Sequence, residues 1–214
     1  MIQIAPSMLS ADFLHLEKDV EMVNAHADLF HLDIMDGVFV PNLSYGFPVV
    51  EAMASKAEKP LDTHLMIVEP EKYVERFVNV GSAMVSFHLN ATKDPDAVLL
   101  KIRECGAKAG LAINPDFPVE SLFPHLKNCD YVLLMSVFAG FGGQKFIEDT
   151  YERVARLKAE IRAQGLNIPI EVDGGVSAAN AGKLAEAGAE ILVAGSAVFK
   201  AEDPAGVIAA MRGE

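Results

Sequence analysis

The chain contains little cysteine, no tryptophan and no long hydrophobic run, although 51% of its 214 residues are hydrophobic. Its two cysteines, Cys105 and Cys129, form no CxxC pair, so the sequence indicates neither a disulfide framework nor a thiolate zinc site. No stretch of about 18 uninterrupted apolar residues is present, so no membrane span is expected. Residues 1–7 lack the basic region of a signal peptide, and we therefore expect a soluble, cytoplasmic protein.

Basic residues are also few. Eighteen Lys and Arg stand against thirty Asp and Glu, which gives a formal net charge of −12. Such an acidic chain is a poor candidate for binding nucleic acid or an anionic membrane surface. It can still bind a small anionic ligand where backbone N–H groups and helix N-termini provide the local positive field.

What the sequence does contain is a regular alternation of β-prone runs and helical segments. The runs cover residues 2–5, 27–34, 61–67, 83–88, 108–113, 131–135, 168–172 and 191–194. No stretch between them resembles a linker, and a chain of this length can bury one sizeable core. Residues 1–214 are therefore predicted to form a single domain.

Helix start and stop signals occupy the segments between these runs. Asp94 and Asp203 each precede a proline, which predicts an N-cap followed by proline at the first helical position. Residues 147–164 carry apolar side chains at helical spacing and precede a glycine, which predicts a helix over this range. Ser177 and Gly188 bracket a further predicted helix.

Eight β-prone runs, each followed by a helical segment, predict an α/β fold of the (β/α)8 or TIM-barrel type. A doubly wound open sheet would give the same alternation and is the alternative. Polar residues at the carboxyl ends of many different runs favour the barrel, where those ends converge on one mouth. These residues are Ser7, Asp33, His64, His88, Asn114, Asp173 and Ser196.

The stretch from His31 to Gly37 places ionisable groups in an otherwise apolar strand. Residues two apart on a strand share a face, so His31, Asp33 and Met35 point to one side. Burying an ionisable pair there costs several kcal/mol unless a partner compensates it, which a bound cation or a reacting substrate would do. The alternative is a hydrogen-bonded core histidine followed by a helix-capping aspartate.

A second histidine and a second aspartate stand at other strand ends. His64 ends the third run and Asp173 ends the seventh, and alone each reads as a structural histidine or a turn-forming aspartate. In a barrel they would meet His31 and Asp33 near the axis. Two imidazoles and two carboxylates suit Zn²⁺, Fe²⁺, Mn²⁺ or Co²⁺ better than Mg²⁺ or Ca²⁺, and the ligand set does not choose among the four.

Glycine-rich turns follow the last three runs. They are the segments 140–143, 174–175 and 195–196. Barrels of this kind commonly bind a substrate phosphate between the last strands, through backbone N–H groups that glycine allows to approach closely. One such turn could simply reverse the chain, but three in succession predict a phosphate site.

Six segments together resemble the ribulose-phosphate 3-epimerase family, and the match runs nearly end to end. The segments are residues 6–9, 31–37, 39–42, 64–66, 140–147 and 171–175. The resemblance implies a (β/α)8 barrel that interconverts D-ribulose 5-phosphate and D-xylulose 5-phosphate, an isomerase of the pentose phosphate pathway. It also implies a homo-oligomer, since the family forms dimers and larger assemblies.

The resemblance further implies roles for individual residues. His31, Asp33, His64 and Asp173 would hold one divalent metal ion, Asp33 and Asp173 would be the acid–base pair, and Ser7 and His64 would touch the substrate. The residues that match the family's substrate and phosphate positions are Gly140, Phe141, Gly142, Gly143, Gly174, Gly175, Gly195 and Ser196.

Inversion at a carbon next to a carbonyl explains why two carboxylates are needed. A proton must leave from one face and another must return to the opposite face, so two groups are required, here Asp33 and Asp173. A cation would stabilise the enediolate between the two transfers. Met35, Met66 and Met135 are expected to line the planar intermediate, although core packing explains each of them equally well.

The sequence departs from the family pattern in two places, and two other classes of enzyme and a non-catalytic protein are alternatives to this activity. Phe138-Ala139 stands where the family commonly has a polar residue and proline, and Asn90 stands where it often has glutamate, so neither His88 nor Asn90 is assigned a role. A 3-epimerase of a six-carbon ketose phosphate, such as D-allulose 6-phosphate, remains an alternative. A Schiff-base lyase needs a lysine at a strand end, and none of the eight runs in this sequence ends in one. A non-catalytic sugar-phosphate binder would not need both carboxylates.

Overall fold

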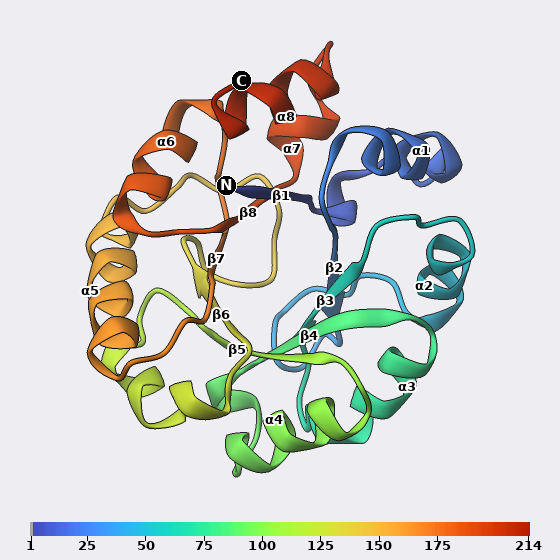
Figure 1. Cartoon of the computed structure of the whole chain (residues 1–214). Coiled ribbons are helices and arrows are strands. Elements are labelled where there is room, and N and C mark those ends of the chain that lie inside the picture. The colour runs from blue at the N-terminus through green and yellow to red at the C-terminus, as the bar shows by residue number, and fades with distance from the viewer. Residues whose placement is uncertain (1) are drawn as a thin grey trace.

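A computed structural model describes residues 2–214, and within them eight parallel strands form one sheet around a central axis (Figure 1). The sheet order is β1-β8-β7-β6-β5-β4-β3-β2, and a parallel bridge between Ser7 and His31 joins the two ends into a barrel. The predicted TIM barrel is confirmed, and the open sheet is wrong. The strands are β1 Gln3–Pro6, β2 Phe30–Met35, β3 Leu61–Met66, β4 Ser82–His88, β5 Lys108–Ile113, β6 Tyr131–Met135, β7 Ile170–Asp173 and β8 Ile191–Ala194.

Helices surround the strands on the outside of the barrel, as Figure 1 shows. The α-helices are α1 Leu16–His26, α2 Phe47–Ala54, α3 Val74–Asn79, α4 Pro95–Glu104, α5 Thr150–Ala163, α6 Ala178–Ala187, α7 Ser196–Phe199 and α8 Pro204–Arg212. Among the described residues, four 3-10 segments complete the connections: η1 Met8–Ser10, η2 Pro70–Lys72, η3 Leu89–Ala91 and η4 Val119–Asn128. In the range 2–214, no helix combines the length and the apolar character needed to cross a membrane.

The helix boundaries follow the capping chemistry read from the sequence. The side chains of Asp94 and Asp203 accept hydrogen bonds from the third residue of α4 and of α8, and Ser177 forms a capping box with Asn180 at the start of α6. Gly188 ends α6 in the left-handed conformation with φ of 117°. These four predicted boundaries are confirmed.

The predicted start of the helix at residue 147 is wrong, because α5 begins at Thr150. The N–H of Ile147 donates to the carbonyl of Ser136 at 3.0 Å, which ties this residue to the end of β6. The connection between β5 and β6 also differs from the alternating pattern. It is the 3-10 segment η4, and Pro124 inside it provides no N–H for an α-helical bond.

Alternation along the strands separates two cores. In β2, Phe30, Leu32 and Ile34 face outward and join the main hydrophobic core between barrel and helices. A smaller apolar cluster fills the amino-terminal end of the barrel interior: Ala5, Leu29, Met84, Tyr131, Ile191 and Val193. Toward the carboxyl ends of the strands, the interior holds buried polar side chains together with the apolar clusters of Met135 and of Met35 and Met66.

Candidate active site

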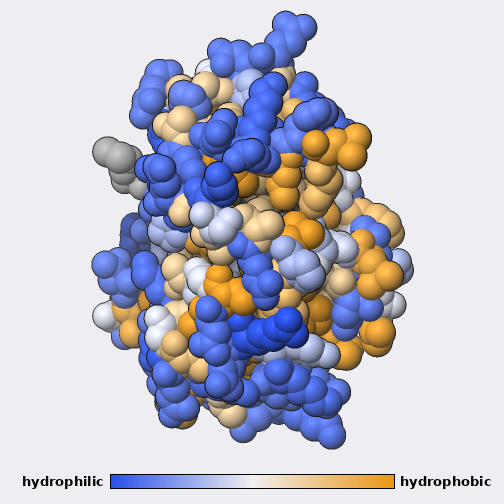
Figure 2. All heavy atoms as spheres, turned by 90° about the vertical axis from the view of Figure 1, so that its right-hand side faces the viewer, coloured by the Kyte–Doolittle hydropathy of each residue, from blue (hydrophilic) through white to orange (hydrophobic). Residues whose placement is uncertain are grey.

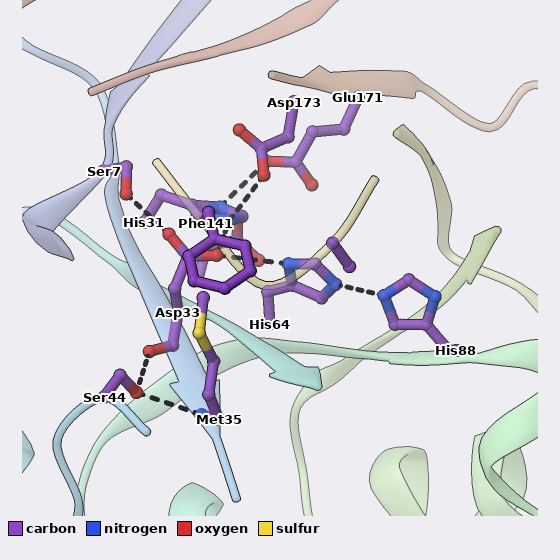
Figure 3. A network of polar contacts seen from close by, with 12 residues as sticks. Ser7, His31, Asp33, Met35, Ser44, His64, His88, Phe141, Glu171 and Asp173 are labelled. Carbon is purple, nitrogen blue, oxygen red and sulfur yellow. Dashed lines mark hydrogen bonds and ion pairs between the residues drawn. The ribbon is translucent and has the colours of Figure 1, made fainter. Parts of the chain in front are cut away.

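Three strands each contribute two ionisable residues, spaced two apart, to the barrel interior. They are His31 and Asp33 on β2, Asp62 and His64 on β3, and Glu171 and Asp173 on β7. The strand register places His31 beside Asp62 and Asp33 beside His64. Figure 3 labels five of them, which converge from strands far apart in the sequence: His31, Asp33, His64, Glu171 and Asp173. The sequence prediction that the two histidines and two aspartates meet is confirmed.

Asp33 is at the centre of the polar residues that lie nearer the carboxyl ends of the strands. It accepts a hydrogen bond from Ser7 Oγ at 2.5 Å, and its Oδ1 lies 3.3 Å from His64 Nδ1 and 3.4 Å from His31 Nε2. Asp173 Oδ2, on β7, approaches the same His31 nitrogen to 4.0 Å. Two carboxylates from strands that are not neighbours in the sheet thus approach one imidazole.

The four predicted ligands fit a metal ion. One donor atom from each of His31, Asp33, His64 and Asp173 lies within 4.8 Å of the others. His31 Nε2 is buried and has no hydrogen-bond partner among residues 2–214. Although burial disfavours the imidazolium, the charges of Asp33 and Asp62 outweigh it and raise the pKa of His31, so this point between the carboxylates favours positive charge. A divalent cation would take the place of that proton.

The environments of the two aspartates push their pKa values apart. Burial favours the neutral acid at Asp33, but the nearby charge of His31 and the hydrogen bond from His64 outweigh it and hold the pKa of Asp33 well below its usual range. At Asp173, burial and the neighbouring charge of Asp33 raise the pKa to about 7. One carboxylate is therefore held ionised beside another that takes up a proton near neutral pH.

Asp62, Glu171 and Tyr131 form a deeper layer that the sequence reasoning missed. His31 Nδ1 lies 2.7 Å from Asp62 Oδ2 and 3.4 Å from Glu171 Oε1, and the Tyr131 hydroxyl donates to Asp62 Oδ1 at 2.9 Å. Burial and the charge of Asp62 raise the pKa of Glu171 well above its usual value. The signal that could have found this layer is the two-residue spacing from His64 and from Asp173.

A cleft opens above these groups at the carboxyl ends of the strands. Its lining includes most of the residues predicted to bind substrate, namely Ser7, Asp33, Met35, Met66, Met135, Gly140, Phe141, Gly142, Gly143, Asp173, Gly174, Gly175, Gly195 and Ser196. It also includes Ser10, Gln144 and Val176, to which the sequence reasoning gave no role. His31 and His64 are fully buried beneath the lining. The three methionines line the cleft and also pack in apolar clusters.

The turn after β7 requires its two glycines. Gly174 and Gly175 have φ of 117° and 63°, which side-chain-bearing residues rarely adopt. A Cβ at Gly175 would lie 2.6 Å from the backbone nitrogen of Phe146, so the turn and the loop after β6 pack backbone against backbone. This close packing brings two of the three glycine-rich turns to the same side of the cleft.

Hydrogen bonds anchor the loop after β6, and one of them depends on Ala139 of the Phe138-Ala139 pair that departs from the family pattern. The backbone N–H of Ala139 donates to Asn114 Oδ1 at 3.0 Å, a bond that proline could not make. Asn42 Nδ2 donates to the carbonyl of Gly140 at 3.0 Å, and Gln144 Nε2 donates to the carbonyls of Phe138 and Phe141. Asn114 after β5, Asn42 in the loop after β2 and Gln144 within the loop itself therefore hold the loop over the cleft.

His88, to which the sequence analysis assigned no role, contacts a predicted metal ligand. Its Nε2 lies 2.9 Å from His64 Nε2, and both rings are fully buried. Burial and the neighbouring His64 hold the pKa of His88 well below its usual range, so this imidazole is neutral. Asn90 lies in η3, outside the cleft lining.

Comparison with known proteins gives the same family along nearly the whole chain. The model of the ribulose-phosphate 3 epimerase family matches residues 3–199. Ribulose-phosphate 3-epimerase of Synechocystis is 46% identical over 99% of this chain and 93% of its own length. The enzymes of the same name from Mycobacterium tuberculosis and Escherichia coli are 44% and 42% identical, covering 98% and 99% of this chain and 91% and 95% of their own lengths.

Solved structures with low identity share the fold. KGPDC from Streptococcus mutans superposes with a TM-score of 0.74 at 13% identity, covering 100% of this chain and 96% of its own. 3-Hexulose-6-phosphate synthase from Salmonella typhimurium superposes with a TM-score of 0.73 at 15% identity, covering 98% and 96%. Because identities this low show only a shared fold, the family assignment rests on the relatives with higher sequence identity. The chain belongs to the ribulose-phosphate 3-epimerase family and is an epimerase.

Proposed function

We propose that this protein interconverts D-ribulose 5-phosphate and D-xylulose 5-phosphate by proton transfer at C3 between two carboxyl groups. The observation that supports this most is the pairing of Asp33 and Asp173. They reach the same imidazole from β2 and β7, one with a lowered pKa and the other with a pKa raised to about 7. The relatives' shared name, ribulose-phosphate 3-epimerase, supports the pentose substrate.

In the proposed reaction the two carboxyl groups act on opposite faces of C3. The ionised carboxylate removes the C3 proton, and the electrons of the broken C–H bond move onto the carbonyl oxygen to give an enediolate. The protonated carboxyl group then donates its proton to C3 from the other face, which inverts the configuration. Asp33 and Asp173 exchange these roles for the reverse direction, and the hydroxyl of Ser7 orients Asp33 by its hydrogen bond.

His31, Asp33, His64 and Asp173 are the residues that would hold one divalent metal ion, zinc, iron(II), manganese or cobalt. When bound, the ion supplies positive charge that stabilises the developing enediolate. Asp62 supports the set by accepting a hydrogen bond from His31 Nδ1, which directs Nε2 of that ring toward the cleft.

The glycine-rich turns are proposed to bind the substrate phosphate. Segments 140–143, 174–175 and 195–196 line one side of the cleft, with the first residue of α7 among them. Backbone N–H groups there compensate the phosphate charge in an otherwise acidic protein. Ser7, which lines the cleft, is proposed to contact the sugar, and Met35, Met66 and Met135 to exclude water around the planar intermediate. The family resemblance also implies that His64 touches the substrate, but this residue lies buried beneath the lining.

The test is isotope exchange during turnover. Purified protein is incubated with D-ribulose 5-phosphate in ²H₂O, with and without a chelator, and C3 is followed by NMR. We expect deuterium at C3 together with D-xylulose 5-phosphate, both suppressed by the chelator. Product without solvent deuterium would contradict proton transfer through exchangeable carboxyl groups. Neither exchange nor product would reject the pentose substrate, and D-allulose 6-phosphate would then be tried.

We also propose that the chain self-associates. Leu14, Val38 and Leu43 are 89%, 73% and 71% exposed, and they lie in the loops that follow β1 and β2. Figure 2 shows hydrophobic residues gathered toward one edge of that view, whereas the rest is mixed. Apolar area of this kind is typical of a protein interface. Light scattering coupled to gel filtration should give a mass above the 23.0 kDa of one chain, and a mass of 23.0 kDa would contradict the proposal.

A further inference from the structure

The two ring nitrogens of His64 face different partners. Nδ1 lies 3.3 Å from Asp33 Oδ1 and faces the proposed metal site. Nε2 points the other way and lies 2.9 Å from Nε2 of His88 at the end of β4. Figure 3 shows this row of Asp33, His64 and His88. The ring centroids lie 5.0 Å apart with the planes inclined by 30°, so the two imidazole rings meet edge to edge at their Nε2 atoms.

Only one proton lies between the two Nε2 atoms, carried either by His64 or by His88. Which ring carries it determines whether His64 can bind a metal through Nδ1. A neutral imidazole carries one N–H and one lone pair. If His88 donates, His64 must carry its own proton on Nδ1, which then points at Asp33 and cannot bind a metal. If His64 donates, its Nδ1 presents a lone pair to the metal site, and His88 carries its proton on Nδ1.

We propose that His88 is a positioning residue for the metal site: it accepts a hydrogen bond from Nε2–H of His64 and so keeps the Nδ1 lone pair of His64 directed at the metal. This inference rests on the proposed function, because it assigns Nδ1 of His64 as a ligand atom. Metal loading then moves one proton on each ring, from Nδ1 to Nε2 on His64 and from Nε2 to Nδ1 on His88, with no net change on the pair.

The contact with His64 is the only hydrogen bond of the His88 side chain among residues 2–214, because its buried Nδ1 has no partner. His88 is fully buried and does not line the cleft, so it reaches the reacting groups only through His64. The ring of Phe39 packs against it with centroids 4.9 Å apart, which fixes its orientation. The two proposed histidine ligands thus have different supports: His31 faces the carboxylate of Asp62, whereas His64 faces a neutral imidazole. Outer partners of this kind commonly change metal affinity by about 10–100-fold when removed.

The first experiment compares two variants of His88 by zinc affinity alone, with no substrate present. His88→Gln places an amide oxygen near the position of Nε2, whereas His88→Leu offers no acceptor. Competition with a chromophoric chelator should show binding weakened about 10–100-fold in His88→Leu and within about threefold of the parent protein in His88→Gln. Equal affinity of His88→Leu and the parent, or equal losses in both variants, would overturn the proposal. Circular dichroism confirms that each variant is folded.

A second measurement uses the unaltered protein and so does not depend on a variant folding. ¹⁵N NMR of the histidine side chains should show, in the zinc-loaded protein, a proton on Nε2 of His64 and on Nδ1 of His88. A proton on Nε2 of His88 in that state would overturn the proposal. Absence of zinc binding would overturn both this inference and the metal in the proposed function. Correct tautomers without deuterium exchange on D-ribulose 5-phosphate would reject only the proposed reaction.

Discussion

The ring of Tyr131 on β6 lies against the α-carbon of Gly110 on the neighbouring strand β5. A Cβ built at position 110 would lie 2.3 Å from Cζ of Tyr131, closer than any real contact. The hydroxyl of the same tyrosine donates to Asp62, which in turn accepts from His31. The missing side chain at Gly110 therefore makes room for the hydrogen-bond chain that supports a proposed metal ligand.

Replacing this glycine should destabilise the protein. Gly110→Ala forces the buried Tyr131 ring out of place, and overpacking of this kind costs about 1–3 kcal/mol. Urea unfolding measures the loss. Gly182→Ala is the matched control, because a Cβ there meets no atom within 4 Å on an exposed position of α6. It should raise stability by about 0.4–1 kcal/mol. A Gly110→Ala protein as stable as the parent would show that the ring can move without cost.

The paired carboxylates should each be essential for turnover. Asp33→Asn and Asp173→Asn keep the size of the side chain but remove its capacity to take up a proton, so each should lower kcat by at least about 10²-fold while the barrel stays folded. Asp96→Asn, which alters a carboxylate that pairs with His125 outside the barrel, should leave kcat unchanged. If either site variant kept a near-normal rate with its metal bound, the two-carboxyl mechanism would be wrong.

The raised pKa of Asp173 predicts a pH dependence of stability in chelator-treated protein. In the unfolded chain the carboxyl group loses its proton above about pH 3.8, whereas in the folded protein it keeps the proton up to about pH 7. Between these values the unfolded state binds fewer protons, so the free energy of unfolding falls as pH rises, by up to about 1.4 kcal/mol per pH unit. Asp173→Asn removes this contribution.

Urea unfolding of both proteins with a chelator, at intervals from pH 4.5 to 7.5, measures the difference. The stability of Asp173→Asn relative to the parent should increase with pH up to about 7 and then become constant. Parallel curves for the two proteins would show that Asp173 ionises in the folded protein as it does in the unfolded chain.

Much of the site could be predicted because strand periodicity and barrel topology are both visible in the sequence. The order of runs places strand ends at one mouth, and the spacing of His31 and Asp33 puts both side chains inside. The same spacing puts Asp62 and Glu171 on the inward face, but it does not show that a buried carboxylate there has a partner. A buried carboxylate is unfavourable taken alone, and only the register of β2 against β3 reveals that His31 compensates Asp62.

The error at the start of α5 also has a physical cause. Apolar spacing continues through Ile147, so periodicity alone extends α5 too far toward its amino terminus. The bond from Ile147 to Ser136 is a tertiary contact, which no local pattern contains. The same limit applied to His88, since its contact with His64 joins two strands whose side-chain orientation depends on the closed barrel.

Arg153 gives a last prediction, because it is a buried cation that bonds to backbone carbonyls. Its guanidinium donates to the carbonyl oxygens of Met135 at 2.9 Å and Asn114 at 3.0 Å, which joins the ends of β6 and β5 beneath the cleft loop. Arg153→Met fills the space but leaves these carbonyls without donors, and we expect a loss of about 1–3 kcal/mol in urea unfolding. Arg156→Met, which removes an exposed ion pair with Glu120, should cost at most about 1 kcal/mol.

Since Asn114 also holds the N–H of Ala139, Arg153→Met should in addition raise the KM for the sugar phosphate. A stability loss with unchanged KM would show that the anchor of the loop does not depend on Arg153.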